Sequence, residues 1–258
     1  MRILMVGDMV GSPGRTAFAR IAGQMKAAGM VDFIVANAEN VAGGRGLTPA
    51  LADEILSAGA DVLTTGDHVW DQKELAPYLN REPRIIRPLN FAPECPGKGW
   101  ITVQTPAGPL TVVQVIGRVF MPPNDCPFRA IDALLKKGLE LGRMIVVDVH
   151  AEATSEKNAM GWYLDGRVSL IAGTHTHVQT ADETILPKGT GFLTDLGMTG
   201  PKHSVIGREI DSVLHKFLTG MPAKFEVSQK DVRLDGLLAT IDEKTGKTTH
   251  LKRIQETI

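Results

Sequence analysis

The sequence predicts an α/β fold built on a mainly parallel β-sheet. Short apolar runs alternate with segments of helical periodicity through residues 3–79, an order typical of parallel strands joined by helical crossovers. Between residues 85 and 116 the apolar runs are separated by turns rich in proline and glycine, which indicates a mixed or second sheet. A chain of 258 residues can bury a large core, so we expect a single domain over residues 1–258.

Each expected element follows from the spacing of its apolar residues. Runs of strand length occupy residues 3–6, 33–36, 61–64, 85–86, 100–104, 110–116, 144–149, 168–172 and 192–194. Helical spacing occurs at residues 16–28, 49–57, about 72–79, 129–141, just before residue 168, and about 209–218. The tail, about residues 224–258, alternates apolar and polar residues around Glu243-Lys244-Thr245-Gly246, which predicts a β-hairpin.

Composition and charge narrow the class of function. Hydrophobic residues make up 43% and charged residues 22% of the chain, as in ordinary soluble proteins. Lys plus Arg number 28 and Asp plus Glu number 29, so the net charge is −1 and we expect no stable complex with nucleic acid. We find neither a signal peptide nor an apolar stretch of roughly 18 residues. Cys95 and Cys126 are expected to be free thiols, and the protein to be cytoplasmic, without membrane association.

Two histidines follow the expected strand 168–172 in the segment Gly173-Thr174-His175-Thr176-His177. In a regular strand His175 and His177 would point to the same side, because side chains repeat every second residue. Imidazole is the commonest metal ligand near neutral pH, so the pair suggests half of a metal site. The spacing alone is a weak signal, since exposed histidine pairs often bind nothing.

Candidate metal ligands follow the other parallel strands as well. The full set at these strand ends is Asp8, Glu39, Asn40, Asp67, His150, His175 and His177. Singly, each has a structural explanation, such as a helix N-cap for Asp8 or a turn for Asn40. Because parallel strands place their carboxyl ends at one edge, we expect the set to converge there. Clustered carboxylates repel one another unless a cation lies among them, so the pattern predicts a metal centre.

The size of the ligand set favours two metal ions. Seven ligands exceed what one transition metal with an open position needs. Two ions about 3.5–4 Å apart, bridged by a carboxylate, would use them all. Nitrogen and oxygen ligands without thiolate suit divalent or trivalent iron, manganese, zinc or cobalt, and the ligand types do not choose among them. Of these metals we expect iron, with manganese or zinc as alternatives.

Several motifs occur together in one known family. They are Gly7-Asp8, Ala38-Glu39-Asn40, Gly66-Asp67-His68, Trp70-Asp71, the blocks 150–157, 159–167 and 173–182, and Gly197-Met198-Thr199-Gly200-Pro201. On these motifs the chain resembles the calcineurin-like metallophosphoesterases, and among them the YmdB-like 2′,3′-cyclic nucleotide phosphodiesterases. The block from His150 to Asp182 is specific, whereas the middle strands and the tail hairpin carry little of the match. The resemblance implies an αββα sandwich of two mixed sheets flanked by helices.

The same resemblance implies roles for the candidate ligands. One metal ion would be held by Asp8, Glu39, Asn40 and His177. The other would be held by Glu39, Asp67, His150 and His175, with Glu39 bridging the two. His68 would be the general acid that protonates the leaving oxygen.

The chain departs from the family pattern at two positions. The broader superfamily has a histidine two residues after the first aspartate, where this chain has Val10, and Asn40 would replace it as a ligand. The family has asparagine before the acid histidine, where this chain has Asp67. The extra carboxylate lowers the positive charge of a loaded centre, so we expect tighter metal retention and a less electrophilic site.

The expected function is hydrolysis of a small phosphodiester, 2′,3′-cyclic nucleotides such as 2′,3′-cAMP, by hydroxide generated at the metal centre. The partner is then a small nucleotide or phosphodiester substrate, and homo-oligomerisation is left open. The alternatives to a phosphodiesterase are a phosphomonoesterase, a nuclease or a non-catalytic regulatory protein that binds metal. Asp71 and Glu152 would orient imidazoles or remain solvated, and Arg15, Arg45 and Arg118 are loop residues that could contact phosphate.

Overall fold

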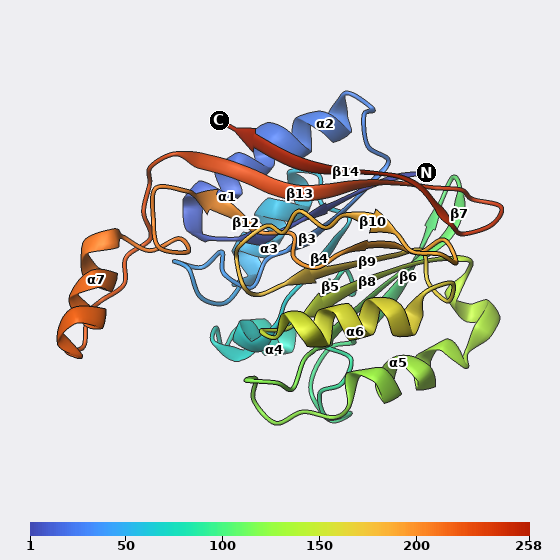
Figure 1. Ribbon diagram of the computed structural model, residues 1–258, viewed down its shortest axis with the longest axis horizontal. Helices are drawn as coiled ribbons and strands as arrows, with labels where there is room; N and C mark the ends of the chain where they lie inside the picture. Colours follow the sequence, from blue (N-terminus) through green and yellow to red (C-terminus); the bar gives the residue numbers. More distant parts are fainter.

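Two mixed β-sheets stack face to face, and helices cover the outer face of each (Figure 1). This arrangement confirms the αββα sandwich. The computed structural model describes residues 1–258, apart from the side chain of Leu139. Among the described residues, no helix combines the length and the apolar character needed to cross a membrane.

The first sheet contains the N-terminal parallel strands and the tail hairpin. Its order is β2-β12-β13-β1-β3-β4-β5, and β14 pairs with β13. The strands are β1 Arg2–Val6, β2 Asp8–Met9, β3 Phe33–Asn37, β4 Val62–Thr64, β5 Ile85–Ile86, β12 Met198–Pro201, β13 Val232–Ile241 and β14 Thr248–Thr257. Strands β1, β3 and β4 run parallel, as predicted. Strand β5 also pairs parallel with β4, so residues 85–86 belong to this mixed sheet and not to the second one. Strand β13 is antiparallel to β1 and inserts between it and β12.

The second sheet contains the strands of residues 100–105 and 108–116, as expected, and four strands that follow them in the chain. Its order is β10-β11-β9-β8-β7-β6, where β6 and β7 form an antiparallel hairpin and β7, β8, β9 and β11 run parallel. The strands are β6 Trp100–Thr105, β7 Gly108–Ile116, β8 Met144–His150, β9 Leu170–Thr174, β10 Thr184–Ile185 and β11 Gly191–Leu193.

The helices differ from the expected ones mainly at their ends. They are α1 Gly11–Phe18, α2 Gln24–Ala27, α3 Pro49–Ser57, α4 Leu75–Tyr78, α5 Pro127–Leu135, α6 Thr154–Leu164 and α7 Ile210–Thr219, with a π-helix Ala19–Gly23 and 3-10 helices Asp67–Trp70 and Gly138–Leu141. The helix expected from residue 16 begins at Gly11, because Pro13 is tolerated in a first turn. The helix expected at 129–141 ends at Leu135, since Gly138 adopts a left-handed φ of 60°.

Three apolar layers hold the sandwich together. The central layer joins both sheets through residues such as Met5, Val35, Val146 and Leu170. One outer layer packs the first sheet against α1 and α3, and the other packs the second sheet against α5 and α6. Burying one such side chain stabilises the fold by about 1.5–3 kcal/mol relative to leaving it exposed.

The topology brings the carboxyl ends of both sets of parallel strands to one edge of the sandwich. His150 ends β8 and pairs with Thr174, the last residue of β9, while β1 and β3 end just before Asp8 and Glu39. In Figure 1, helix α7 projects from the sandwich, away from both sheets. Residues from the edges of both sheets and from one projecting helix can therefore contribute side chains to the same site.

Candidate metal centre

The two histidines after β9 lie in a turn rather than in a strand. Strand β9 ends at Thr174, and the φ angles of His175 and His177 are 97° and 64°. The orientation that a regular strand would give the pair, with both side chains on one side, therefore does not apply to this turn. Positive φ at a non-glycine residue costs about 1–3 kcal/mol and persists only where the surroundings hold it. Here Asp8 Oδ2 accepts a hydrogen bond of 3.1 Å from the His175 backbone N–H.

A buried ion pair supports the same turn. Lys157 Nζ donates to Asp195 Oδ2, and the Thr176 hydroxyl donates to the same oxygen at 2.7 Å. Gly173 lies so close to the next strand that a Cβ there would come within 1.9 Å of the Thr194 carbonyl oxygen. No sequence pattern indicates this pair, because Lys157 lies in α6 and Asp195 follows β11, and only the folded chain brings them together.

One group of candidate ligands surrounds His150. Donor atoms of Glu39, Asp67, His150 and His175 all lie within 4.8 Å of one another. His150 Nε2 is 3.2 Å from Glu39 Oε1, 3.0 Å from Asp67 Oδ1 and 3.0 Å from His175 Nδ1. These four residues are the set that the family resemblance implied for one metal ion.

The second group shares Glu39 with the first. Asn40 Nδ2 is 3.3 Å from Glu39 Oε1 and 3.3 Å from His177 Nε2, which is in turn 3.9 Å from Asp8 Oδ1. A half-turn of the Asn40 amide would present its oxygen at the same place. Asp8 Oδ1 is buried and has no hydrogen-bond partner among the described residues. Since a buried carboxylate oxygen without a partner is costly, this group also fits a cation.

The charges of the cluster favour a cation at its centre. Burial opposes charge on His150, but Glu39, Asp67 and Asp8 outweigh it and raise the pKa of this imidazole well above its usual value. Burial raises the pKa of Asp8. For Asp67, burial is outweighed by contacts with His150 and His175, which hold its pKa below the usual range. A proton on His150 thus compensates the carboxylates, and a bound metal ion would take over that role.

A buried chain of hydrogen bonds orients His150. The Thr174 hydroxyl lies 2.7 Å from Asp148 Oδ1 and 2.9 Å from His150 Nδ1. Because ionised Asp148 only accepts, Thr174 donates to it and accepts from His150 Nδ1–H. Burial raises the pKa of Asp148 only to about 6, so the carboxylate is ionised at neutral pH. With a metal ion bound in place of the compensating proton, His150 would therefore keep its proton on Nδ1 and offer the Nε2 lone pair as the ligand.

Replacing Thr174 with valine should weaken metal binding about 10- to 100-fold, because the isosteric side chain removes the hydroxyl that selects the His150 tautomer. Titration with a competing chelator measures the dissociation constant, and circular dichroism checks the fold. Thr174→Ser retains the hydroxyl and should restore affinity. Wild-type affinity in Thr174→Val would show that the chain does not orient His150.

His68 lies beside the first ligand group. Its Nδ1 is 3.1 Å from Asp67 Oδ2, and its backbone N–H donates to Glu39 Oε2 at 3.1 Å. Glu152 Oε2 lies 3.3 Å from His175 Nε2, so of the two carboxylates considered for orienting imidazoles this one makes the contact. Asp71 lies 3.9 Å from His68 Nδ1 and is paired more closely with Arg45, at 2.6 Å.

The arginine beside the site differs from those expected. Arg15 is bound to Glu54 and Arg45 to Asp71, whereas Arg208 lines the cavity that contains the ligands. Burial, together with the charge of Arg45, lowers the pKa of Arg208, which stays protonated at neutral pH because guanidinium is so strongly basic. Arg208 follows Gly207 in a loop, which is the signal that a sequence offers for an arginine of this kind.

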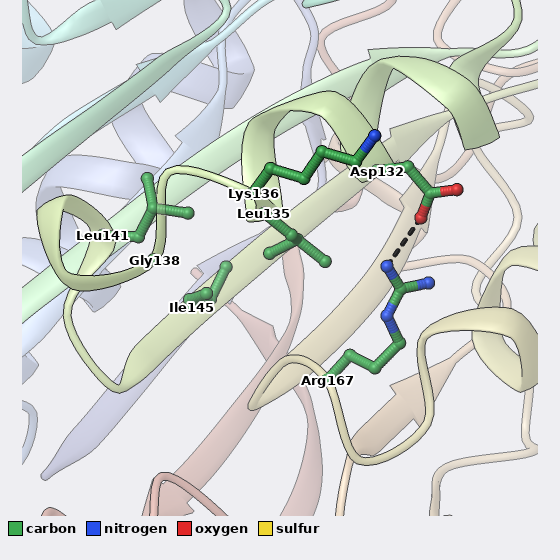
Figure 2. Close-up of a pocket in the computed structure, with 7 residues that line it drawn as sticks. All are labelled: Asp132, Leu135, Lys136, Gly138, Leu141, Ile145 and Arg167. Carbon is green, nitrogen blue, oxygen red and sulfur yellow. Dashed lines mark hydrogen bonds and ion pairs between the residues drawn. The ribbon is translucent and has the colours of Figure 1, made fainter.

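Four of the candidate ligands line a cavity of about 700 Å³, together with His68, Glu152 and part of α7. They are Glu39, Asn40, His175 and His177. Figure 2 shows a different hollow of about 500 Å³, between α5, β8 and the segment before β9. Two of its charged side chains, Asp132 and Arg167, are paired with each other at 2.6 Å. No metal-ligand candidate lines this second hollow, so the chemistry belongs to the first cavity.

Comparison with known proteins agrees with the geometry. Two stacked mixed sheets with acidic and imidazole side chains at their adjoining edges are the arrangement of the calcineurin-like metallophosphoesterases, and this chain belongs to that class. A family model described as YmdB-like protein matches residues 4–254, and the chain belongs to that family.

Individual relatives are similar over nearly their whole length. The 2′,3′-cyclic-nucleotide 2′-phosphodiesterase of Bacillus subtilis is 43% identical, over 98% of this chain and 96% of the relative. A crystal structure of a hypothetical protein from Thermus thermophilus is 41% identical, with a TM-score of 0.93, over 100% of this chain and 99% of the other. A crystal structure titled a novel phosphatase, from Mycoplasma pneumoniae, is 32% identical, with a TM-score of 0.93, over 100% and 93% of the two chains.

Proposed function

We propose that this chain is a metal-dependent phosphodiesterase that hydrolyses 2′,3′-cyclic nucleotides at a dinuclear centre, with His68 as the general acid. The observation that carries the proposal is the pair of ligand groups that share Glu39 and adjoin His68 in one cavity. The name of the Bacillus subtilis relative supports the class of substrate. We expect a small nucleotide in the cavity rather than a stable nucleic-acid complex, because the net charge is −1.

The ligand groups suit two transition-metal ions, with iron as our first choice and manganese or zinc as alternatives. One ion would be held by Asp8, Glu39, Asn40 and His177, and the other by Glu39, Asp67, His150 and His175. When bound, the ions would acidify water and neutralise charge on the phosphate oxygens. Asp8, Glu39, Asn40 and His150 are each at most 4% exposed, so the ions would be held in an environment of low dielectric.

His68 would hold the proton that goes to the departing ribose oxygen. Its Nδ1–H can donate to Asp67 Oδ2 at 3.1 Å, so in the imidazolium form the Nε2–H is the donor left to face the cavity. The hydrogen bond from its backbone N–H to Glu39 fixes the ring relative to the ligands. A general acid placed in this way contributes about 10²–10⁴-fold to the rate.

A substrate panel tests the proposal. Metal-loaded protein is assayed with 2′,3′-cAMP, 3′,5′-cAMP, a phosphomonoester and single-stranded RNA, and kcat/KM should be highest for 2′,3′-cAMP. The crystal structure titled a phosphatase makes the monoester the strongest competitor. Preference for the monoester would contradict the phosphodiesterase proposal, and preference for RNA would indicate a nuclease. A metal-loaded protein that hydrolyses none of them would favour the regulatory alternative.

Replacing Asp67 with asparagine should loosen the metals and raise turnover. Two divalent ions with three carboxylates leave a formal charge of +1 at the centre, against +2 when residue 67 is neutral. A unit charge 4 Å from a cation is worth about 4 kcal/mol at an effective dielectric of 20, so we expect metal dissociation constants at least about tenfold higher. Turnover should rise by up to about tenfold, because the phosphate meets a more electrophilic centre. Unchanged turnover and unchanged metal affinity in Asp67→Asn would refute this account.

A further inference from the structure

The cavity that contains the metal-ligand candidates extends well beyond them. Glu39, His175 and His177 line one end, and Val213, Phe217 and Phe225 line the other, within the same volume of about 700 Å³. This volume falls in the range of sites that enclose small organic ligands, about 300–1,000 Å³. A phosphate group at the ligands would fill only one end, so the apolar end is available to the rest of a substrate.

The apolar end is built by α7 and the chain that follows it. Val213 is buried and anchors the helix, whereas Phe217, one turn further on, is 82% exposed. The helix ends at Gly220, whose left-handed φ of 70° turns the chain back. Phe225 then lies beside the helix, with Lys216 Nζ 5.1 Å from the centre of its ring. Two phenyl groups therefore belong to the same wall, and exposed aromatic rings are the surfaces on which nucleobases stack.

Arg208 lies between the two ends of the cavity. Its guanidinium donates to the carbonyl oxygens of Gly43 at 3.1 Å and of Phe225 at 3.3 Å, so it ties the loop after Asn40 to the aromatic wall. Among the described residues no carboxylate oxygen lies within 4.0 Å of it. Gly44 allows this placement, because a Cβ there would come within 2.4 Å of Arg208 Nη1. The positive charges of Arg208 and Lys216 complement an anionic substrate.

We propose that the wall formed by Phe217 and Phe225 is the nucleoside subsite of this protein, where a planar base stacks while the phosphate lies between Arg208 and the metal ligands. This assignment rests on the proposed function, because it requires a nucleotide phosphate at the ligands. The cavity supplies the reason for the occupant, since the aromatic wall and the ligands enclose one continuous volume. Arg208, which no carboxylate oxygen approaches within 4.0 Å among the described residues, favours an anionic nucleotide over a neutral aromatic compound.

The test compares a cyclic phosphate that has a base with one that lacks it. Phe217→Ala should lower kcat/KM for 2′,3′-cAMP about 5- to 150-fold more than for glycerol 1,2-cyclic phosphate, which corresponds to one lost stacking contact. The difference should appear mainly in KM, and Phe217→Trp should keep the wild-type preference. Leu218→Ala is the matched control, because Leu218 is the next residue of α7, is also 82% exposed and is absent from the cavity lining. Equal losses on both substrates would overturn the subsite.

Binding without turnover separates the subsite from the proposed function. Calorimetric titration of the metal-loaded protein with 3′-AMP should give a Kd about 5- to 150-fold higher for Phe217→Ala than for wild type. If the wild-type protein hydrolyses neither cyclic phosphate, the proposed function fails. The titration still tests the nucleoside subsite in that case, because it measures binding and not turnover. Equal affinities in the two proteins would overturn it. A change of sedimentation coefficient shared by Phe217→Ala and Leu218→Ala would assign the face to a protein interface and also overturn the subsite.

Discussion

Replacing His68 with alanine is expected to lower the turnover of 2′,3′-cAMP by about 10²–10⁴-fold while the metal content stays at the wild-type level. The ribose oxygen is a poor leaving group and needs a proton as its bond to phosphorus breaks. His68 is the side chain placed to deliver it, because Asp67 holds its Nδ1 and Glu39 holds its backbone N–H. Alanine keeps the backbone contact to Glu39, so the ligand groups should survive the substitution.

Steady-state kinetics together with elemental analysis of the purified variant measure this outcome. The loss should be much smaller for a diester with a p-nitrophenolate leaving group, which departs without a proton. His250→Ala is the control, since His250 is an exposed residue of β14 outside the cavity. Loss of metal from His68→Ala would instead make His68 a ligand, and an equal loss for both leaving groups would remove its role as an acid.

Replacing Glu39 with glutamine should have the second large effect, namely loss of both metal ions and a fall in turnover of at least about 10²-fold. Glu39 Oε1 faces both His150 and Asn40, so it belongs to both ligand groups. Glutamine has nearly the same volume, and its amide oxygen can still accept from the His68 backbone at the position of Oε2. The variant should therefore fold while it lacks the charge that bridges the two groups.

Elemental analysis of purified Glu39→Gln measures the metal content per chain, and the melting temperature checks that the variant is folded. His175→Ala and His177→Ala provide the comparison, because each histidine belongs to a different group and each variant should first lose a different ion. A Glu39→Gln variant that retains both metals would exclude a bridging role. A variant that loses only one would place Glu39 in a single group.

Much of the fold could be predicted because its signals are local. Runs such as 33–36 and 144–149 are bounded by polar residues, and the alternation of strands and helices indicates parallel pairing. The expected helix 49–57 agrees with α3 at both ends, because Thr48 caps it and Pro49 begins it. The errors occur where tertiary contacts override local preference. Gly14 in α1 is an example, since a Cβ there would come within 2.5 Å of the Thr199 carbonyl oxygen of β12.

For the site, the residues at the strand ends could be predicted from the sequence, because parallel strands carry the residues that follow them to one edge of the sheet. How those residues are held depends on contacts between segments that are distant in the chain. Asp8 supports the turn at His175 from 167 positions away, and Thr174 orients His150 only because β8 and β9 pair in that register. Arg208 and Phe217 join the cavity through contacts with segments that are remote in the chain. The periodicity of the sequence does not reveal these contacts, because they form only when the two sheets and α7 pack together.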